Sequence, residues 1–228
     1  MLMLKRAIAV IGPPAVGKTT LTMQLGQVPG RQIFRLREHV PKTILAATAT
    51  SAEQLGWIDD ITVTRALQGY IESVVSDDTT HIVLLDNFPG NDTQAQLLLS
   101  ILHKSAPVCV VTVVELAADA ATIQSRVRER RVCHRCERDP IHDPRLPAVP
   151  NPADQRRCSR CNSVLHPRRG DAPRLLRARI QRYERAAISI REAFAGVGIE
   201  ILQLESNRPP EHTACELTTR LAIRSTPS

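Results

Sequence analysis

The chain has 228 residues and a net charge of +7, and aromatic residues make up only 3% of it. A chain of this length can bury most of its apolar surface in one α/β domain with an appendage, and its core must rest on Val, Ile, Leu and Ala. No apolar run approaches the ~20 residues that a membrane-spanning helix needs, and residues 1–5 are too short and too charged for a signal peptide. We therefore expect a cytoplasmic protein with no membrane partner.

Positive charge is concentrated in the later half of the chain. Between Arg126 and Arg191 there are 18 arginines and seven acidic residues. Such an excess favours either the binding of polyphosphate or nucleic acid, or a solvated arginine-rich surface. Charge alone does not choose between these interpretations.

The first element is an apolar run at 7–11, which predicts a strand and is followed by the sequence GPPAVGKTT at 12–20. This segment satisfies the pattern G-x-x-x-x-G-K-[ST], in which glycines let successive backbone N–H groups surround a phosphate without Cβ clashes. Lys18 would reach the β- and γ-phosphates, and the Thr19 hydroxyl could hold Mg²⁺. The alternative is a plain turn, but the strand–loop–helix context favours an NTP site. Its candidate residues are Gly12, Pro13, Pro14, Ala15, Val16, Gly17, Lys18, Thr19 and Thr20.

Strands and helices alternate along the rest of the chain. Asp60 is placed to cap a helix expected at 61–75, and Asp171 to cap a long arginine-rich helix that ends near Phe194. The continuous apolar run at 81–86 has the form of a parallel strand buried on both faces. Together these elements predict an α/β protein with a mostly parallel, doubly wound sheet. We also expect strands at 32–36, 108–115 and 199–204, and helices at 18–27, 41–55, 91–104, 118–131 and 211–223.

Asp86 ends the apolar run at 81–86. In a chain with a phosphate-binding loop, a carboxylate at the C-terminal edge of a buried parallel strand is the usual place for a residue that directs Mg²⁺. The alternative is an ordinary helix cap. We therefore predict Mg²⁺ with ATP as a cofactor, and Asp86 as a candidate catalytic residue.

The segment 132–165 interrupts the alternation of strands and helices. It contains two C-x-x-C pairs separated by 21 residues, five of which are proline. Such pairs bring four thiolates to one ion, and a tetrahedral site of four cysteines suits Zn²⁺. Free or disulfide-bonded cysteines are the alternative, but a disulfide fits a reducing compartment poorly. Because the segment has too few apolar residues for its own core, we predict a structural zinc ion held by Cys133, Cys136, Cys158 and Cys161.

Several short motifs follow one another along the chain. They are the loop at 12–20, L-D-N-F-P at 85–89, Gln94, Arg126 with Arg130, the cysteine pairs, R-R-G-D at 168–171, and Arg179. Arg126 and Arg130 stand four residues apart and so are expected on one helix face. From Ala7 to about Leu204, the chain resembles the adenylate kinase family in its long-lid, zinc-containing form.

This resemblance implies a P-loop NTPase-type fold with an inserted zinc-ribbon-like lid, and transfer of the ATP γ-phosphoryl group to a nucleoside monophosphate or a similar anionic acceptor. The kinase core would comprise residues 1–131 and 166–228, with an acceptor-binding region at about 32–76 and the lid at 132–165. We expect a monomer whose partners are small-molecule nucleotides. The resemblance implies ATP contacts by Arg126, acceptor contacts by Gln94, Mg²⁺ organisation by Asp86 and Thr19, and catalytic charge neutralisation by Lys18, Arg130, Arg168 and Arg179.

The acceptor half of the chain departs from the family pattern. Gly90 stands where the motif D-G-F-P-R has an arginine for the acceptor phosphate, and residues 34–39 replace the motif S-[TA]-G-D-x-[LI]-R. Alternation along an extended strand would put Arg35 and Arg37 on one side, with Leu36 turned away. We therefore predict that Arg35 or Arg37 anchors an anionic acceptor. The alternative is that both are surface arginines.

Two other functions remain open. One is a P-loop kinase that acts on a non-nucleotide small molecule. The other is a zinc-ribbon protein that binds nucleic acid and is gated by ATP. Against the second, five arginines stand at positions that suit phosphoryl transfer, and the segment 132–165 has no aromatic residue for base stacking. We therefore do not expect a nucleic-acid partner.

Overall fold

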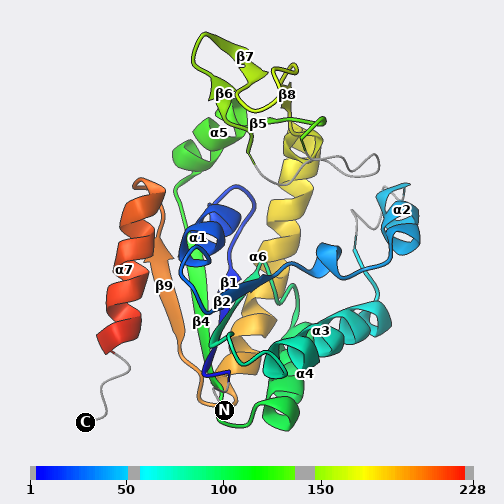
Figure 1. Ribbon diagram of the computed structural model, residues 1–228, viewed down its shortest axis with the longest axis vertical. Helices are drawn as coiled ribbons and strands as arrows, with labels where there is room; N and C mark the ends of the chain where they lie inside the picture. The colour runs from blue at the N-terminus through cyan, green and yellow to red at the C-terminus, as the bar shows by residue number, and fades with distance from the viewer. Residues whose placement is uncertain (1–3, 51–56, 137–146, 224–228) are drawn as a thin grey trace.

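The computed structural model describes residues 4–50, 57–136 and 147–223. Its centre is a five-stranded sheet in the order β2-β3-β1-β4-β9, in which every pairing of neighbours is parallel (Figure 1). The predicted α/β class with a mostly parallel sheet is therefore confirmed. The strands are β1 (Arg6–Ile11), β2 (Arg31–Phe34), β3 (Ile82–Asp86), β4 (Val110–Ala117) and β9 (Ile201–Glu205).

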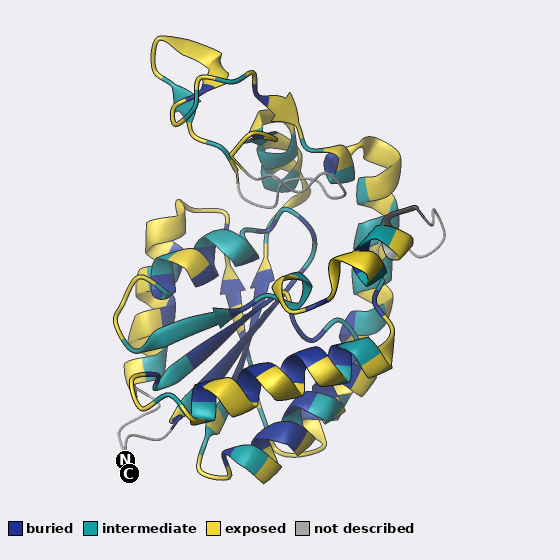
Figure 2. Ribbon diagram, turned by 45° about the vertical axis from the view of Figure 1, so that its right-hand side comes forward, coloured by how far each residue is buried: buried dark blue, intermediate teal, exposed yellow. Residues whose placement is uncertain are grey.

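Helices cover both faces of the sheet, so that its central strands are buried (Figure 2). One face carries α1 (Lys18–Leu25) and α7 (Pro210–Ile223), and the other carries α3 (Asp60–Val75), α4 (Asp92–Ser105) and α6 (Pro173–Ala195). Successive residues of a strand point to opposite faces, and β1 accordingly divides between two cores. Ile8 and Val10 pack on the side of α1 and α7, whereas Ala7 and Ala9 pack on the side of α3, α4 and α6.

The described part of the cysteine segment (residues 132–165) projects from one end of the sheet, between α5 (Ala120–Glu129) and α6 (Figure 1). Two short antiparallel strands, β5 (Arg131–Val132) and β8 (His166–Pro167), join its two ends to the core. Inside it, β6 (Pro150–Asn151) pairs with β7 (Asp154–Cys158). In the described ranges, no helix has the length and apolar character needed to cross a membrane.

Two predicted helix caps were wrong. The N-cap of α3 is Asp59, whose side chain accepts a hydrogen bond from the backbone N–H of Thr62, and Asp60 is the first helical residue. The N-cap of α6 is Ala172, which has no side-chain cap, while Asp171 lies in the short 3₁₀ helix η2 (Arg169–Asp171). Pro173 at the first helical position of α6 has no N–H that would need a cap, which frees the Asp171 carboxylate for other contacts.

Other boundaries also differ from the prediction. Strand β2 ends at Phe34, and the chain then turns through the 3₁₀ helix η1 (Leu36–Glu38). Helix α5 ends at Glu129, and Arg130 has extended backbone angles. Arg126 and Arg130 therefore do not share a helix face as predicted. Of the helix expected at 41–55, α2 (Lys42–Thr50) is present, and 51–55 lie outside the described residues.

Candidate functional site

The loop between β1 and α1 folds around its own lysine. Gly12 has φ +142°, and a Cβ atom there would lie 2.6 Å from the carbonyl oxygen of Leu116, so only glycine fits. Gly17 has φ +105° and is the N-cap of α1. The buried Lys18 side chain turns back into the loop, where its Nζ donates to the carbonyl oxygens of Gly12 and Pro13, each at 2.7 Å. The two glycines of the sequence motif are thus required by the backbone of this loop.

Asp86 ends β3 beside this loop and is buried. Its Oδ1 accepts a hydrogen bond from Thr19 Oγ1 at 3.2 Å, and its Oδ2 accepts one from Arg35 Nε at 3.2 Å. Thr19 and Asp86 meet because β1 and β3 are parallel neighbours, whose carboxyl ends lie at the same edge of the sheet. Hydroxyl and carboxylate oxygens are hard donors of the kind that Mg²⁺ prefers, so Thr19 and Asp86 fit such an ion.

Lys18 has a strongly positive environment. Burial lowers its pKa to about 7, and the negative charge of Asp86 opposes this shift. Three arginines, Arg179, Arg130 and Arg168, lower the pKa further by charge repulsion. An anionic ligand beside Lys18 would offset both the repulsion and the loss of hydration.

Arg126 connects α5 to the loop and to the end of β9. Its Nη1 donates to the carbonyl oxygen of Val16 at 2.9 Å, and its Nη2 donates to the carbonyl oxygen of Ser206. The Ser206 hydroxyl also donates to Val16 O, at 2.7 Å. Ser206 was missed in the sequence, although a hydroxyl two residues after the last predicted strand is a signal that could have found it. Arg126 therefore lies against the loop, where the ATP side of the site was predicted.

Asp171 organises the arginines on the other side of the site. It is buried and accepts hydrogen bonds from Arg130 at both carboxylate oxygens, one of them from Nε at 2.7 Å. Arg179 lies 3.7 Å from Asp171 Oδ1 and donates to the carbonyl oxygen of Gly170 at 3.0 Å. Burial and the neighbouring Arg168 lower the pKa of Arg179 to about 10. One carboxylate thus holds two arginines within a larger cluster of like charge.

These groups line one cavity of about 1200 Å³ at the carboxyl edge of the sheet. Among its described lining residues, eleven are Lys or Arg, and only Asp86 and Glu129 are acidic. Such an excess of cations in a concave site favours a ligand with several negative charges. The cavity brings together most of the predicted site residues, namely Gly12, Pro14, Ala15, Val16, Gly17, Lys18, Thr19, Thr20, Arg35, Arg37, Asp86, Gln94, Arg126, Arg130, Arg168 and Arg179, whereas Pro13 is not part of its lining.

Glu115, near the C-terminal end of β4, connects α6 to the sheet, and sequence reasoning missed it. It is buried, and Arg191 donates to both of its carboxylate oxygens, at 2.9 and 2.6 Å, while the Tyr183 hydroxyl donates to Oε1. Burial alone would raise the pKa of Glu115, but the hydrogen bonds from Arg191 and Tyr183 lower it. The signal in the sequence was a carboxylate at the end of an otherwise apolar run. This clamp fixes the helix that carries Arg179.

The two arginines proposed to anchor the acceptor are not arranged as predicted. Because β2 ends at Phe34, Arg35 and Arg37 do not alternate along one strand, although both line the cavity. The Arg35 guanidinium contacts two carboxylates, those of Asp86 and Glu38, at 3.2 and 3.3 Å. The charge of Arg35 is therefore already matched by anions of the protein.

The surroundings of Gly90 differ from those of a phosphate anchor. The Gly90 N–H donates to Oε1 of the buried Gln94 at 2.8 Å, and a Cβ on Gly90 would lie 3.2 Å from both Gln94 Oε1 and the Trp57 ring. On Trp57, the Arg182 guanidinium lies 5.5 Å from the ring centroid, a cation–π contact. An indole ring therefore lies against the position at which the resemblance expects an arginine.

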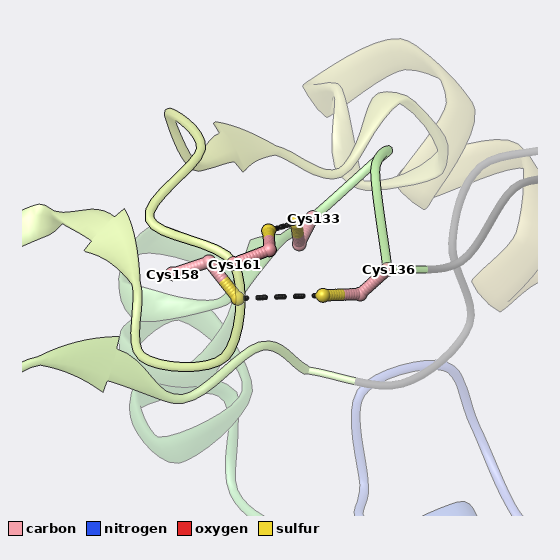
Figure 3. A group of neighbouring side chains, drawn as sticks. All are labelled: Cys133, Cys136, Cys158 and Cys161. Atoms are coloured by element: carbon pink, nitrogen blue, oxygen red, sulfur yellow. Dashed lines mark hydrogen bonds between the residues drawn. The ribbon is translucent and has the colours of Figure 1, made fainter.

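The four predicted cysteines of the cysteine segment converge at one point (Figure 3). Their sulfur atoms all lie within 4.8 Å of one another, with Cys133 Sγ 3.4 Å from Cys161 Sγ and Cys136 Sγ 3.7 Å from Cys158 Sγ. A tetrahedral zinc ion with Zn–S bonds of about 2.3 Å requires sulfur atoms about 3.8 Å apart. All six cysteines of the chain are free, so the disulfide alternative was wrong, and the cluster could hold a metal ion, zinc being the best fit.

We predict one zinc ion per chain at this cluster. Replacing Cys158 with serine is expected to remove the metal, because three thiolates and a hydroxyl bind Zn²⁺ far more weakly than four thiolates. Elemental analysis of protein prepared without chelator measures this directly. Cys215→Ser, on the exposed surface of α7, is the matched control and should keep the full metal content. Wild-type protein without metal would contradict the prediction.

Comparison with known proteins leaves the site to be interpreted from its own residues. No family model matches the chain, and no curated protein matches it either.

Proposed function

We propose that the protein is an ATP-dependent phosphotransferase that moves the γ-phosphoryl group of ATP to a nucleoside monophosphate or a similar anionic acceptor. In this respect it would resemble adenylate kinases. The observation that carries the proposal is the shared cavity, in which the glycine-dependent loop with Lys18 faces the arginine cluster held by Asp171. A protein that only binds one phosphate would need only the loop. The additional arginine cluster in the same cavity can neutralise the charge of a phosphoryl group while it is transferred from ATP to an acceptor.

Phosphoryl transfer needs positioned cations and little covalent chemistry from the protein. Under this proposal Lys18, Arg130 and Arg179 neutralise charge on the migrating phosphoryl group, together with Arg168. Arg126 would orient the nucleotide phosphates through its contacts with the loop. Thr19 and Asp86 would hold Mg²⁺, which supplies charge neutralisation and alignment of the phosphates when it is bound.

The experiment that tests the proposal is a panel of acceptors. ATP is supplied with each nucleoside monophosphate in turn, and ADP formation is compared with the rate in the absence of acceptor. We expect at least one acceptor to raise that rate well above ATP hydrolysis alone, because a bound acceptor replaces water at the reacting phosphate. If the whole panel leaves ADP formation at the acceptor-free rate, the nucleotide acceptor is wrong.

A second candidate is a kinase whose anionic acceptor is not a nucleotide. It is favoured by the contacts at Gly90, which carries no cationic side chain of its own and lies against Gln94 and the Trp57 ring. Such an acceptor would contact the Trp57 indole at the place where the resemblance expects an arginine that binds the acceptor phosphate. Failure of every nucleoside monophosphate, with phosphoryl transfer to a phosphorylated or carboxylated small molecule, would select this candidate.

Nucleotide binding is expected to take up about one proton per chain at pH 8. The pKa of Lys18 is about 7 in the ligand-free protein, so the amine is mostly neutral at pH 8, and adjacent phosphates would raise its pKa and protonate it. The contribution of Lys18 to the affinity should therefore be constant below pH 7 and fall by up to about ten-fold per pH unit above it. Calorimetric titrations of ADP in buffers of different ionisation enthalpy measure the uptake. The Lys18→Ala variant should show none, and wild-type binding enthalpies that do not depend on the buffer would contradict the assignment.

A further inference from the structure

Arg35 forms an ion pair with Asp86, the carboxylate that would bind Mg²⁺ under the proposed function. The Arg35 Nε atom donates to Asp86 Oδ2 at 3.2 Å, while the other oxygen of Asp86 accepts from Thr19. Both partners of this ion pair are largely shielded, since the side chains of Arg35 and Asp86 are 17% and 5% exposed. The pairing depends on the fold, because β2 and β3 are parallel neighbours and their ends place the two residues side by side.

A guanidinium and a divalent cation compete for the same carboxylate. Each is attracted by the negative charge of Asp86, and each needs its oxygen atoms at close range. An arginine held on Asp86 therefore reduces the charge that this site offers to Mg²⁺. A shielded position strengthens this effect, because the charges are screened less by water there.

Arg35 is shared with a second carboxylate. Its Nη1 lies 3.3 Å from Glu38 Oε1, on η1 three residues further along the chain. The Glu38 side chain is 46% exposed, so it attracts Arg35 from the solvent side, whereas Asp86 attracts it from the buried side. Among the described residues, removing Glu38 would leave Asp86 as the carboxylate that Arg35 contacts, and removing Arg35 would take one guanidinium away from Asp86.

We propose, on the basis of the function proposed above, that Arg35 is a resident counterion of Asp86 that sets the Mg²⁺ requirement of nucleotide binding. Arg35 is then a positioning residue that acts through Asp86. Glu38 tunes it by holding part of its charge away from Asp86. The two neighbouring residues of opposite charge are therefore predicted to have opposite effects on the same measured quantity.

The test is the ratio of the ADP dissociation constants measured by calorimetry without and with Mg²⁺. Arg35→Ala should increase this ratio by about three- to ten-fold, because Asp86 becomes fully available to the ion. Glu38→Gln should decrease it by about two-fold or more, because Glu38 then no longer draws the charge of Arg35 away from Asp86. Arg65→Ala is the matched control: it removes an equal charge from the exposed surface of α3, outside the cavity lining, and should change the ratio less than about two-fold.

The outcomes separate this inference from the proposed function. Normal ADP binding with an unchanged or smaller ratio in Arg35→Ala overturns the counterion role alone, as does a shift of the same sign in Glu38→Gln. A wild-type protein that binds no ADP at any Mg²⁺ concentration overturns the proposed function and this inference with it. If Arg35→Ala does not fold, as judged by circular dichroism, the exposed Glu38→Gln change still decides the question by the sign of its shift.

Discussion

Replacing Lys18 with alanine is expected to lower phosphoryl transfer by about 10²–10⁴-fold while the protein stays folded. The Nζ atom is enclosed by the loop, where it lies within hydrogen-bond distance of two carbonyl oxygens, and it shares the cavity with the arginines opposite. The loop at 12–20 has no second cationic side chain, so no neighbour within the loop replaces the lost charge. Burial already disfavours the charged amine, and its removal should therefore cost little stability.

The measurement is turnover of the purified variant at saturating ATP with the best acceptor from the panel. Lys104→Ala, at the exposed C-terminal end of α4, is the matched control and should keep wild-type turnover within about two-fold. The thermal unfolding midpoints of both variants show whether the fold is retained. A folded Lys18→Ala protein with more than about a tenth of wild-type turnover would mean that the loop does not hold the reacting phosphates.

Asp171→Asn is expected to have the second largest effect, with a loss of turnover of about 10²-fold and of about 3 kcal/mol in the free energy of unfolding. The carboxylate is buried and bonded to Arg130 through both oxygens, and it also faces Arg179. An amide of the same shape offers one acceptor oxygen and no charge, so the arginine cluster loses the buried counter-charge that Asp171 supplies. The guanidinium groups should then repel one another and leave their positions.

Asp154→Asn is the matched control for this variant. Asp154 also pairs with an arginine, since Arg157 Nε lies 3.3 Å from its Oδ2, but both side chains are about half exposed. A pair of this kind contributes about 0–1 kcal/mol, so the control should unfold and turn over like the wild type. Chemical denaturation and the turnover assay measure the two effects separately. Equal behaviour of Asp171→Asn and Asp154→Asn would show that Asp171 does not organise the cluster.

Several features of this protein could be predicted from the sequence because they depend on residues close together in the chain. The alternation of strands and helices follows from hydrophobic periodicity, and the parallel sheet follows from that alternation. The loop at 12–20 needs glycine at two positions for its local backbone. Each cysteine pair has two residues between its cysteines, a spacing that is visible in the sequence itself. Such signals depend on neighbouring positions in the chain, so they can be recognised without knowing the fold.

Only the tertiary structure determined which polar and charged side chains contact one another. Arg35 reaches Asp86 across 51 positions, Arg130 reaches Asp171 across 41, and Tyr183 reaches Glu115 across 68. Each contact depends on which strands are neighbours in the sheet and on where a helix crosses it, and hydrophobic periodicity carries no information about either. For this reason the sequence assigned Asp171 to a helix cap and Arg35 to the acceptor, whereas the fold gives each of them a partner of opposite charge.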